Sequence, residues 1–119
     1  MSFIVVATAA AVASSVLGLG FLLAGPFMLK QWELDVGPTG LLLARRIGAI
    51  YLGLAVMMIG GRSAPPSTLR SAVAYGAGTF LALLALLGIY EYLSKRVGTG
   101  IAVSIVVETA LAVCFFWAA

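Results

Sequence analysis

Three charged side chains of this sequence lie more than one helical turn inside long apolar stretches, where a charge is unfavourable. Glu108 lies in the run from about residue 99 to residue 118, and Arg45 and Arg46 lie in the run from about residue 40 to residue 61. A charged side chain at the centre of a membrane-spanning helix costs about 2.5 to 3.5 kcal/mol on insertion scales. A carboxylate and a guanidinium can lower that cost by pairing, and both can also hold a proton or an anion in a buried site.

Helix geometry favours such a pair. If the two runs point the same way in a bundle, the arginines and Glu108 lie at depths that differ by roughly 6 Å, because each helical residue rises 1.5 Å. An arginine side chain spans that distance. We therefore predict that Glu108 points into the bundle within reach of Arg45 or Arg46, and the spacing does not choose between the two arginines. Glu91 follows the run of about residues 68–89, which precedes the run that holds Glu108, and it could join the pair. Tyr51 is expected to find a hydrogen-bond partner.

These residues leave two main interpretations open. In the first, the pair of charges is a clip that fixes the helix register. In the second, it lines a polar pocket in which Glu108 is the candidate catalytic acid or proton carrier, and Arg45, Arg46, Tyr51 and Glu91 contact a ligand. A third possibility is that Glu108 is protonated against lipid or a second subunit.

The composition indicates the elements that must position these groups. Of 119 residues, 63% are hydrophobic and 9% are charged, whereas a soluble domain carries about 25% charged residues. Four apolar runs each approach the ~20 residues that cross a bilayer as a helix. They cover about residues 2–23, 40–61, 68–89 and 99–118. The sequence predicts a single all-α membrane domain, with four transmembrane helices in an antiparallel up-down bundle and both termini on one side.

Local signals refine these elements. Gly25-Pro26 should end or bend the first helix, and Ser67 is a plausible N-cap of the third. The segment Met28–Val36 mixes apolar and charged residues, so we expect a short surface helix there. Small residues at four-residue intervals indicate closely packed faces in all four runs. These stripes are Ala10/Ser14/Gly18, Ala49/Gly53, Ala74/Gly78/Ala82 and Ser104/Glu108/Ala112.

The composition also excludes several kinds of chemistry. The chain has no histidine and one cysteine, so His-ligated metal sites, an internal disulfide and histidine triads are excluded, and we expect neither a metal nor a cofactor. The net charge is +3, and the basic residues lie near the ends of the apolar runs. This placement indicates contact with lipid headgroups rather than with nucleic acid.

The same charges suggest an orientation. Five Lys and Arg residues lie toward the first and third loops, against two toward the other side. The positive-inside rule then places those loops in the cytoplasm and both termini outside, in a multi-pass protein of the inner (plasma) membrane. Aromatic residues that could anchor the two interfaces are Trp32, Tyr90, Tyr92 and Trp117.

The stretch Arg45–Leu54 reads Arg-Arg-Ile-Gly-Ala-Ile-Tyr-Leu-Gly-Leu. It resembles the Arg-x-x-Gly-x-x-Tyr/Leu-Leu-Gly stretch of small DoxX-like four-helix bacterial membrane proteins, and a fourth run with one Glu is similar too. The resemblance implies a four-helix fold and a membrane location. Some DoxX-like relatives are associated with redox or quinone-linked functions, and this chain has no His or Cys motif to carry such chemistry.

Three functions are compatible with the sequence. The first is binding of a lipophilic ligand or partner in a polar pocket around Glu108 and Arg45/Arg46. The second is proton-coupled transport of a small molecule by a homo-dimer through Glu108. The third is acid–base catalysis, of an isomerase or cyclase type, on a lipid-soluble substrate. Small multidrug transporters share the length and the four spans, but their essential carboxylate lies in the first span, which here carries no charge.

Overall fold

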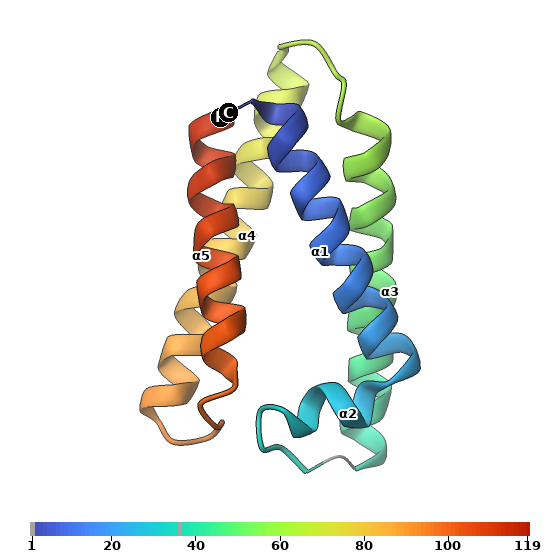
Figure 1. Ribbon diagram of the computed structural model, residues 1–119, viewed down its shortest axis with the longest axis vertical. Coiled ribbons are helices and arrows are strands. Elements are labelled where there is room, and N and C mark those ends of the chain that lie inside the picture. Colours follow the sequence, from blue (N-terminus) through green and yellow to red (C-terminus); the bar gives the residue numbers. More distant parts are fainter. Residues whose placement is uncertain (1, 36) are drawn as a thin grey trace.

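The structure is a computed structural model that describes residues 2–35 and 37–119. Its helices are α1 (Phe3–Leu23), α2 (Gly25–Lys30), α3 (Pro38–Gly61), α4 (Thr68–Leu93) and α5 (Ile101–Ala118). The four long helices alternate in direction, and both termini lie at the same end (Figure 1). Each of the four is long and apolar enough to cross a membrane. The predicted all-α, antiparallel four-helix membrane bundle is confirmed.

Capping residues explain where several helices begin. The Ser67 side chain accepts a hydrogen bond from the Arg70 backbone N–H at 3.1 Å, which confirms the predicted N-cap of α4. Proline occupies the first turn of both α2 and α3, where no N–H is needed. A short helix does follow α1, but α2 begins at Gly25, earlier than the predicted Met28–Val36, because Pro26 favours a helix start there. Val36 lies outside the described residues.

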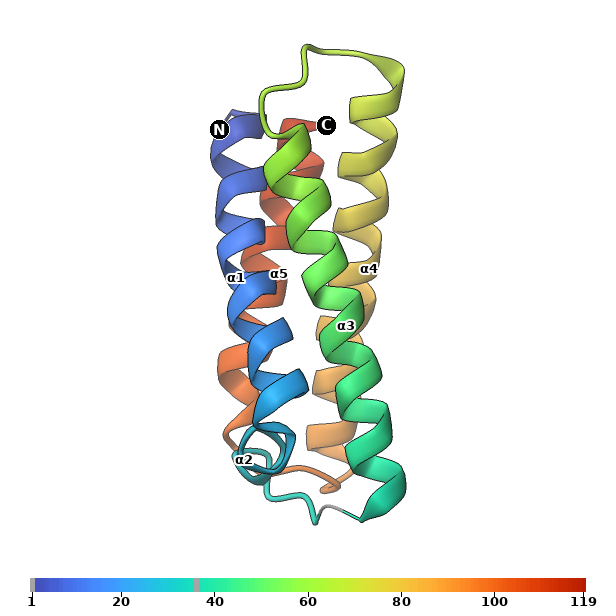
Figure 2. The same cartoon turned by 90° about the vertical axis from the view of Figure 1, so that its right-hand side faces the viewer.

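The long helices form two close pairs. Helix α1 packs along α3, and α4 packs along α5, whereas the two pairs meet through α1 and α5. Within the described residues, α3 and α4 do not approach each other closely although they are consecutive. The pairs converge at the end that holds the termini and diverge toward α2 (Figure 1), and all four helices run roughly parallel to the long axis (Figure 2).

The core lies at the end where the pairs converge. A cluster of buried apolar side chains from all four long helices fills it, and Phe115 and Ala74 at its centre have no exposed surface. At the opposite end, the Gly98 N–H donates a hydrogen bond of 2.9 Å to the Trp32 carbonyl. The turn after α2 therefore joins the connection between α4 and α5, so the two pairs are linked at both ends.

Glycines set the distance between α1 and α3. A Cβ added to Gly48 would lie 2.7 Å from the Leu22 backbone N and 2.8 Å from the Gly18 carbonyl oxygen. The two backbones therefore touch here, as small residues allow in membrane bundles. The buried face of α3 carries Ala44, Gly48 and Ala55.

The stripe of small residues that we predicted for this helix is wrong. Ala49 and Gly53, which we expected to pack, are exposed. A one-residue change of position rotates a side chain by about 100° around a helix, so the wrong choice of small residues selects the wrong face. The stripes of the other three helices are confirmed on the inner side, with Ala10, Gly18 and Ala112 buried.

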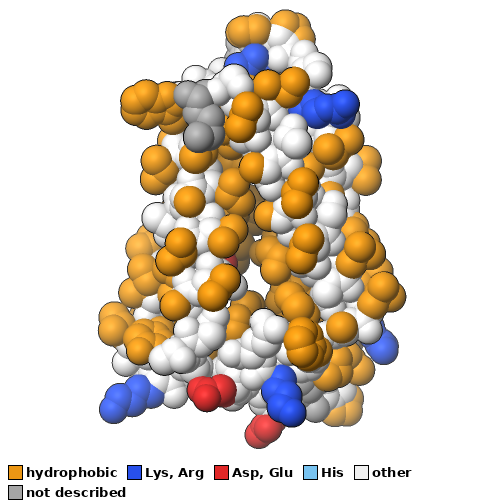
Figure 3. Space-filling view, in the orientation of Figure 1, with side chains coloured by type: hydrophobic (Ala, Val, Ile, Leu, Met, Phe, Trp, Pro, Cys, Tyr) orange, Lys and Arg blue, Asp and Glu red, His pale blue; other side chains and the backbone are white. Residues whose placement is uncertain are grey.

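Apolar side chains also cover the outside of the bundle. Large exposed hydrophobic residues are distributed over all four long helices, and Figure 3 shows them across the face formed by α1 and α5. An apolar surface of this extent needs lipid around it rather than water. The chain is therefore a small multi-pass membrane protein.

Candidate functional site

A small cavity lies at the centre of the bundle, and all four long helices line it. Its volume is about 30 Å³, and a space of about 10–15 Å³ by this measure already holds one water molecule. Apolar side chains make up most of its wall. The lining residues are Ala10, Ala13, Ser14, Leu17, Tyr51, Leu54, Met58, Ala77, Phe80, Leu81, Val107, Glu108, Leu111 and Phe115.

Glu108 supplies the one charged group of this lining. Its side chain is half-buried, and its Oε2 atom is buried without a hydrogen-bond partner among the described residues. Ser14 of α1 and Tyr51 of α3 bring the other polar side chains to the cavity. The prediction that Glu108 points into the bundle is confirmed, and its neighbourhood is apolar apart from two hydroxyl groups.

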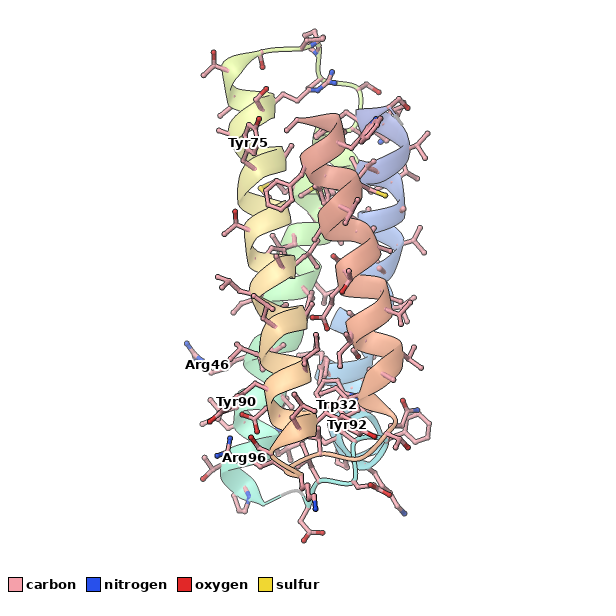
Figure 4. All side chains as sticks on the ribbon, turned by 90° about the vertical axis from the view of Figure 1, so that its left-hand side faces the viewer. Trp32, Arg46, Tyr75, Tyr90, Tyr92 and Arg96 are labelled. Carbon is pink, nitrogen blue, oxygen red and sulfur yellow. The ribbon has the colours of Figure 1, made fainter. Side chains whose placement is uncertain are left out.

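The two arginines do not reach this cavity. Arg45 and Arg46 are both exposed, and neither lines it; Arg46 points away from the bundle (Figure 4). The predicted ion pair with Glu108 is not formed. The reason is the phase of α3: its inner face carries Ala44 and Gly48, and the arginines lie at other angles around the helix.

Glu91 lies away from the cavity as well. It accepts hydrogen bonds from Arg96 in an ion pair of 3.3 Å, the one ion pair within residues 2–35 and 37–119. The Arg96 guanidinium also lies 5.4 Å from the centre of the Tyr90 ring. Hydrogen bonds to Tyr90 and to Glu91 raise the pKa of Arg96, so the guanidinium stays protonated and positively charged. Glu91 therefore belongs to a charged group at the end of α4.

A row of aromatic rings connects the cavity with the α2 end. The Tyr51 and Phe21 rings are nearly parallel, with centres 6.4 Å apart and an angle of 12°. Phe21 in turn meets Trp32 edge-on at 5.9 Å. Sequence reasoning assigned Trp32 to the membrane interface and did not connect it with Tyr51. The contact between Phe21 and Tyr51 joins two spanning helices, so helix spacing could have suggested it. The contact between Phe21 and Trp32 could not be predicted in this way, because the position of Trp32 depends on the turn after α2.

Ser14 is a further cavity residue, which the sequence analysis placed on a packing stripe but not among the site residues. It is the one buried polar side chain among the described residues. The signal was present, because Ser14 lies between Ala10 and Gly18 on the small stripe of α1. Ser14 places a hydroxyl group on the α1 side of the cavity.

A second hollow of about 150 Å³ lies near the 62–67 connection, and its wall includes Phe3, Met57 and Arg70. Arg70 is already engaged there. It donates a hydrogen bond of 3.0 Å to the Ala64 carbonyl, and its guanidinium lies 4.6 Å from the centre of the Phe3 ring. These contacts fix Arg70 as a structural link between α4 and the N-terminal turn of α1.

The described residues do not form a metal site. In the described part of the chain, no three His, Cys, Asp or Glu side chains come together as a metal site would require. The candidate site is therefore a single carboxylate with two hydroxyl groups in an apolar cavity.

No protein-family model matches this chain, and no curated protein or solved structure matches it.

Proposed function

We propose that this membrane protein binds a lipophilic molecule from the bilayer, and that Glu108 receives one hydrogen-bond-donating or positively charged group of that molecule. The observation that carries the proposal is the Oε2 atom of Glu108: it is buried, it has no partner among the described residues, and its residue lines an apolar cavity. A buried carboxylate oxygen without a partner is unfavourable by about 1–3 kcal/mol. A donor from a ligand would satisfy it.

The size of the cavity limits what can enter. A volume of about 30 Å³ admits one small polar group and no more. The apolar body of a ligand would instead lie in the hollow between the two helix pairs, which Figure 3 shows on the face formed by α1 and α5. The Tyr51 ring, which lines the cavity and stacks on the buried Phe21 ring, would offer it an aromatic contact. A long-chain amine or alcohol has the required shape.

The other two functions receive less support from the geometry. Transport needs water access to Glu108 from both sides, but the buried cluster around Phe115 and Ala74 fills the end of the bundle that holds the termini. Acid–base catalysis as the sequence suggested it needs an arginine beside Glu108, and both arginines of α3 face outward. Ligand binding needs only the cavity and a path from the lipid.

Thermal unfolding in detergent tests the proposal. The purified protein is titrated with a long-chain primary amine, the matching alcohol and the matching fatty acid. We expect the amine and the alcohol to raise the unfolding temperature, since a ligand at 100 times its Kd stabilises the folded state by about 2.7 kcal/mol. The fatty acid, tested at a pH at which it is ionised, should have no effect, because its carboxylate offers Glu108 neither a donor nor a positive charge. The shift should vanish in Glu108→Leu.

The matched control is Thr109→Val. Thr109 lies at the same depth on α5 but is exposed, so its replacement should leave the amine response intact. If Glu108→Leu responds to the amine as the unchanged protein does, or if all three compounds stabilise equally, the proposed site is wrong.

A further inference from the structure

The five arginines of this protein differ in how their guanidinium groups are satisfied. Arg62 Nη1 donates to the Ile59 carbonyl at 2.6 Å, Arg70 Nη1 donates to the Ala64 carbonyl at 3.0 Å, and Arg96 pairs with Glu91. Arg45 and Arg46 have neither a hydrogen bond nor an ion pair within residues 2–35 and 37–119, and both are exposed on α3. The described residues therefore leave both guanidinium groups open to acceptors in the surroundings of the helix.

The depth of the two arginines shows what lies beside them. Helix α3 begins at Pro38, so Arg45 lies seven residues into it (45 − 38), or about 10 Å at 1.5 Å per residue. Figure 4 places Arg46 slightly nearer the middle of the bundle than Trp32 and Tyr90. Such aromatic rings mark the headgroup level of a bilayer. A guanidinium just inside this level reaches the lipid phosphates when its side chain extends toward the interface.

Small residues form a low strip on the exposed surface of α3 next to Arg45. Ala49 and Gly53 follow Arg45 at intervals of four residues and are exposed. A Cβ added to Gly53 would meet nothing within 4 Å. The larger Ile50 side chain, which is 64% exposed, borders this stripe on one side. The stripe runs from Arg45 toward the middle of the membrane for about 12 Å.

We propose that Arg45 and Arg46 bind the phosphate of an anionic phospholipid, with one acyl chain lying along the Ala49–Gly53 stripe. Two positive charges without a protein acceptor complement the phosphate, and arginine offers it paired N–H groups. The small residues let the acyl chain lie close to the α3 backbone. This lipid site is separate from the Glu108 cavity, so each proposal can fail without the other.

Lipid retention tests the site. The protein is reconstituted in vesicles of equal parts phosphatidylglycerol and phosphatidylcholine, extracted with a mild detergent, and its bound lipids are counted by native mass spectrometry. We expect the unchanged protein to retain phosphatidylglycerol in preference to phosphatidylcholine. Arg45→Gln/Arg46→Gln should lower that retention about tenfold or more, since each basic residue near the membrane surface contributes several-fold to the attraction.

The matched control is Arg62→Gln/Arg96→Gln, which removes the same charge from two arginines that have protein acceptors. It should keep the preference for phosphatidylglycerol. Gly53→Leu gives a second test that leaves the charge unchanged: it fills the stripe on an exposed face and should weaken retention on its own. Because Gly53 is open to lipid, this variant should fold normally.

Several results would overturn the proposal. The unchanged protein could show no preference between the two lipids, or the control could lose phosphatidylglycerol as fully as the Arg45/Arg46 variant does. Loss of phosphatidylglycerol on adding inorganic phosphate, with equal thermal stabilisation by phosphate alone, would identify a free-anion site instead of a lipid site. Unchanged retention in Gly53→Leu would rule out the acyl-chain position.

Discussion

A carboxylate oxygen without a hydrogen-bond partner inside an apolar bundle lowers the stability of the fold, and within residues 2–35 and 37–119 Glu108 carries such an atom. Its Oε2 is buried, and the cavity that Glu108 lines is otherwise apolar except for the Ser14 and Tyr51 side chains. Because Arg45 and Arg46 face outward, removing the carboxylate leaves no buried positive charge behind. Stability and ligand binding should therefore respond in opposite directions to substitutions at this residue.

Glu108→Met tests this opposition at the residue level. Replacing the carboxylate by an apolar side chain of similar length should raise the free energy of unfolding by about 1 kcal/mol, since an unsatisfied buried polar group is removed. Binding of the long-chain amine should be lost in the same variant. Reversible unfolding in mixed micelles measures the change, with the exposed Thr109→Met as a control that should be neutral. A destabilised Glu108→Met protein would mean that the carboxylate has a structural partner.

At the level of the helices, the α1–α3 pair depends on one close crossing. The Gly48 Cα faces backbone atoms of Leu22 and Gly18, which cannot move aside as the end of a flexible side chain can. The α4–α5 pair is held differently, because the Phe116 ring packs over Gly78 at 3.0 Å from where a Cβ would lie. The two pairs therefore differ in how well they tolerate added atoms.

A comparison of two glycine substitutions on α3 tests the crossing. Gly48→Ala should destabilise the protein by about 1–3 kcal/mol, since its methyl group overlaps backbone on α1. Gly53→Ala, five residues along the same helix, meets open space and should be neutral or slightly stabilising, because alanine favours the helix. Thermal melts of both variants in one detergent make the comparison. Equal effects of the two substitutions would show that α1 and α3 are not in contact at Gly48.

For the whole molecule, hydropathy predicted the four spans and their alternating directions, because length and apolar character alone decide which segments cross a bilayer. The site was predicted only in part. Two small-residue stripes compete on α3, Ala44/Gly48 and Ala49/Gly53, and spacing does not tell which one faces α1. The arrangement in two pairs was also not predictable, because it depends on contacts between helices far apart in the sequence, such as those around Phe115.

The orientation of the whole molecule in its membrane is the last prediction. The end that holds α2 carries five basic residues, whereas the opposite end carries Arg62 and Arg70. The five are Lys30 at the end of α2, Lys95 and Arg96 between α4 and α5, and Arg45 and Arg46 on α3. Basic residues near span ends favour the cytoplasmic side. We therefore expect the α2 end to face the cytoplasm and both termini to face outward.

Single cysteines in a Cys114→Ser background report this orientation. Ser63 and Ser94 are exposed in connections at opposite ends of the bundle, so each can carry a cysteine without disturbing the core. A membrane-impermeant maleimide should label Ser63→Cys in intact cells, and it should label Ser94→Cys only after the membrane is permeabilised. The reverse pattern would invert the orientation. Labelling of both in intact cells would show that the protein inserts in both directions, as the small difference of five basic residues against two allows.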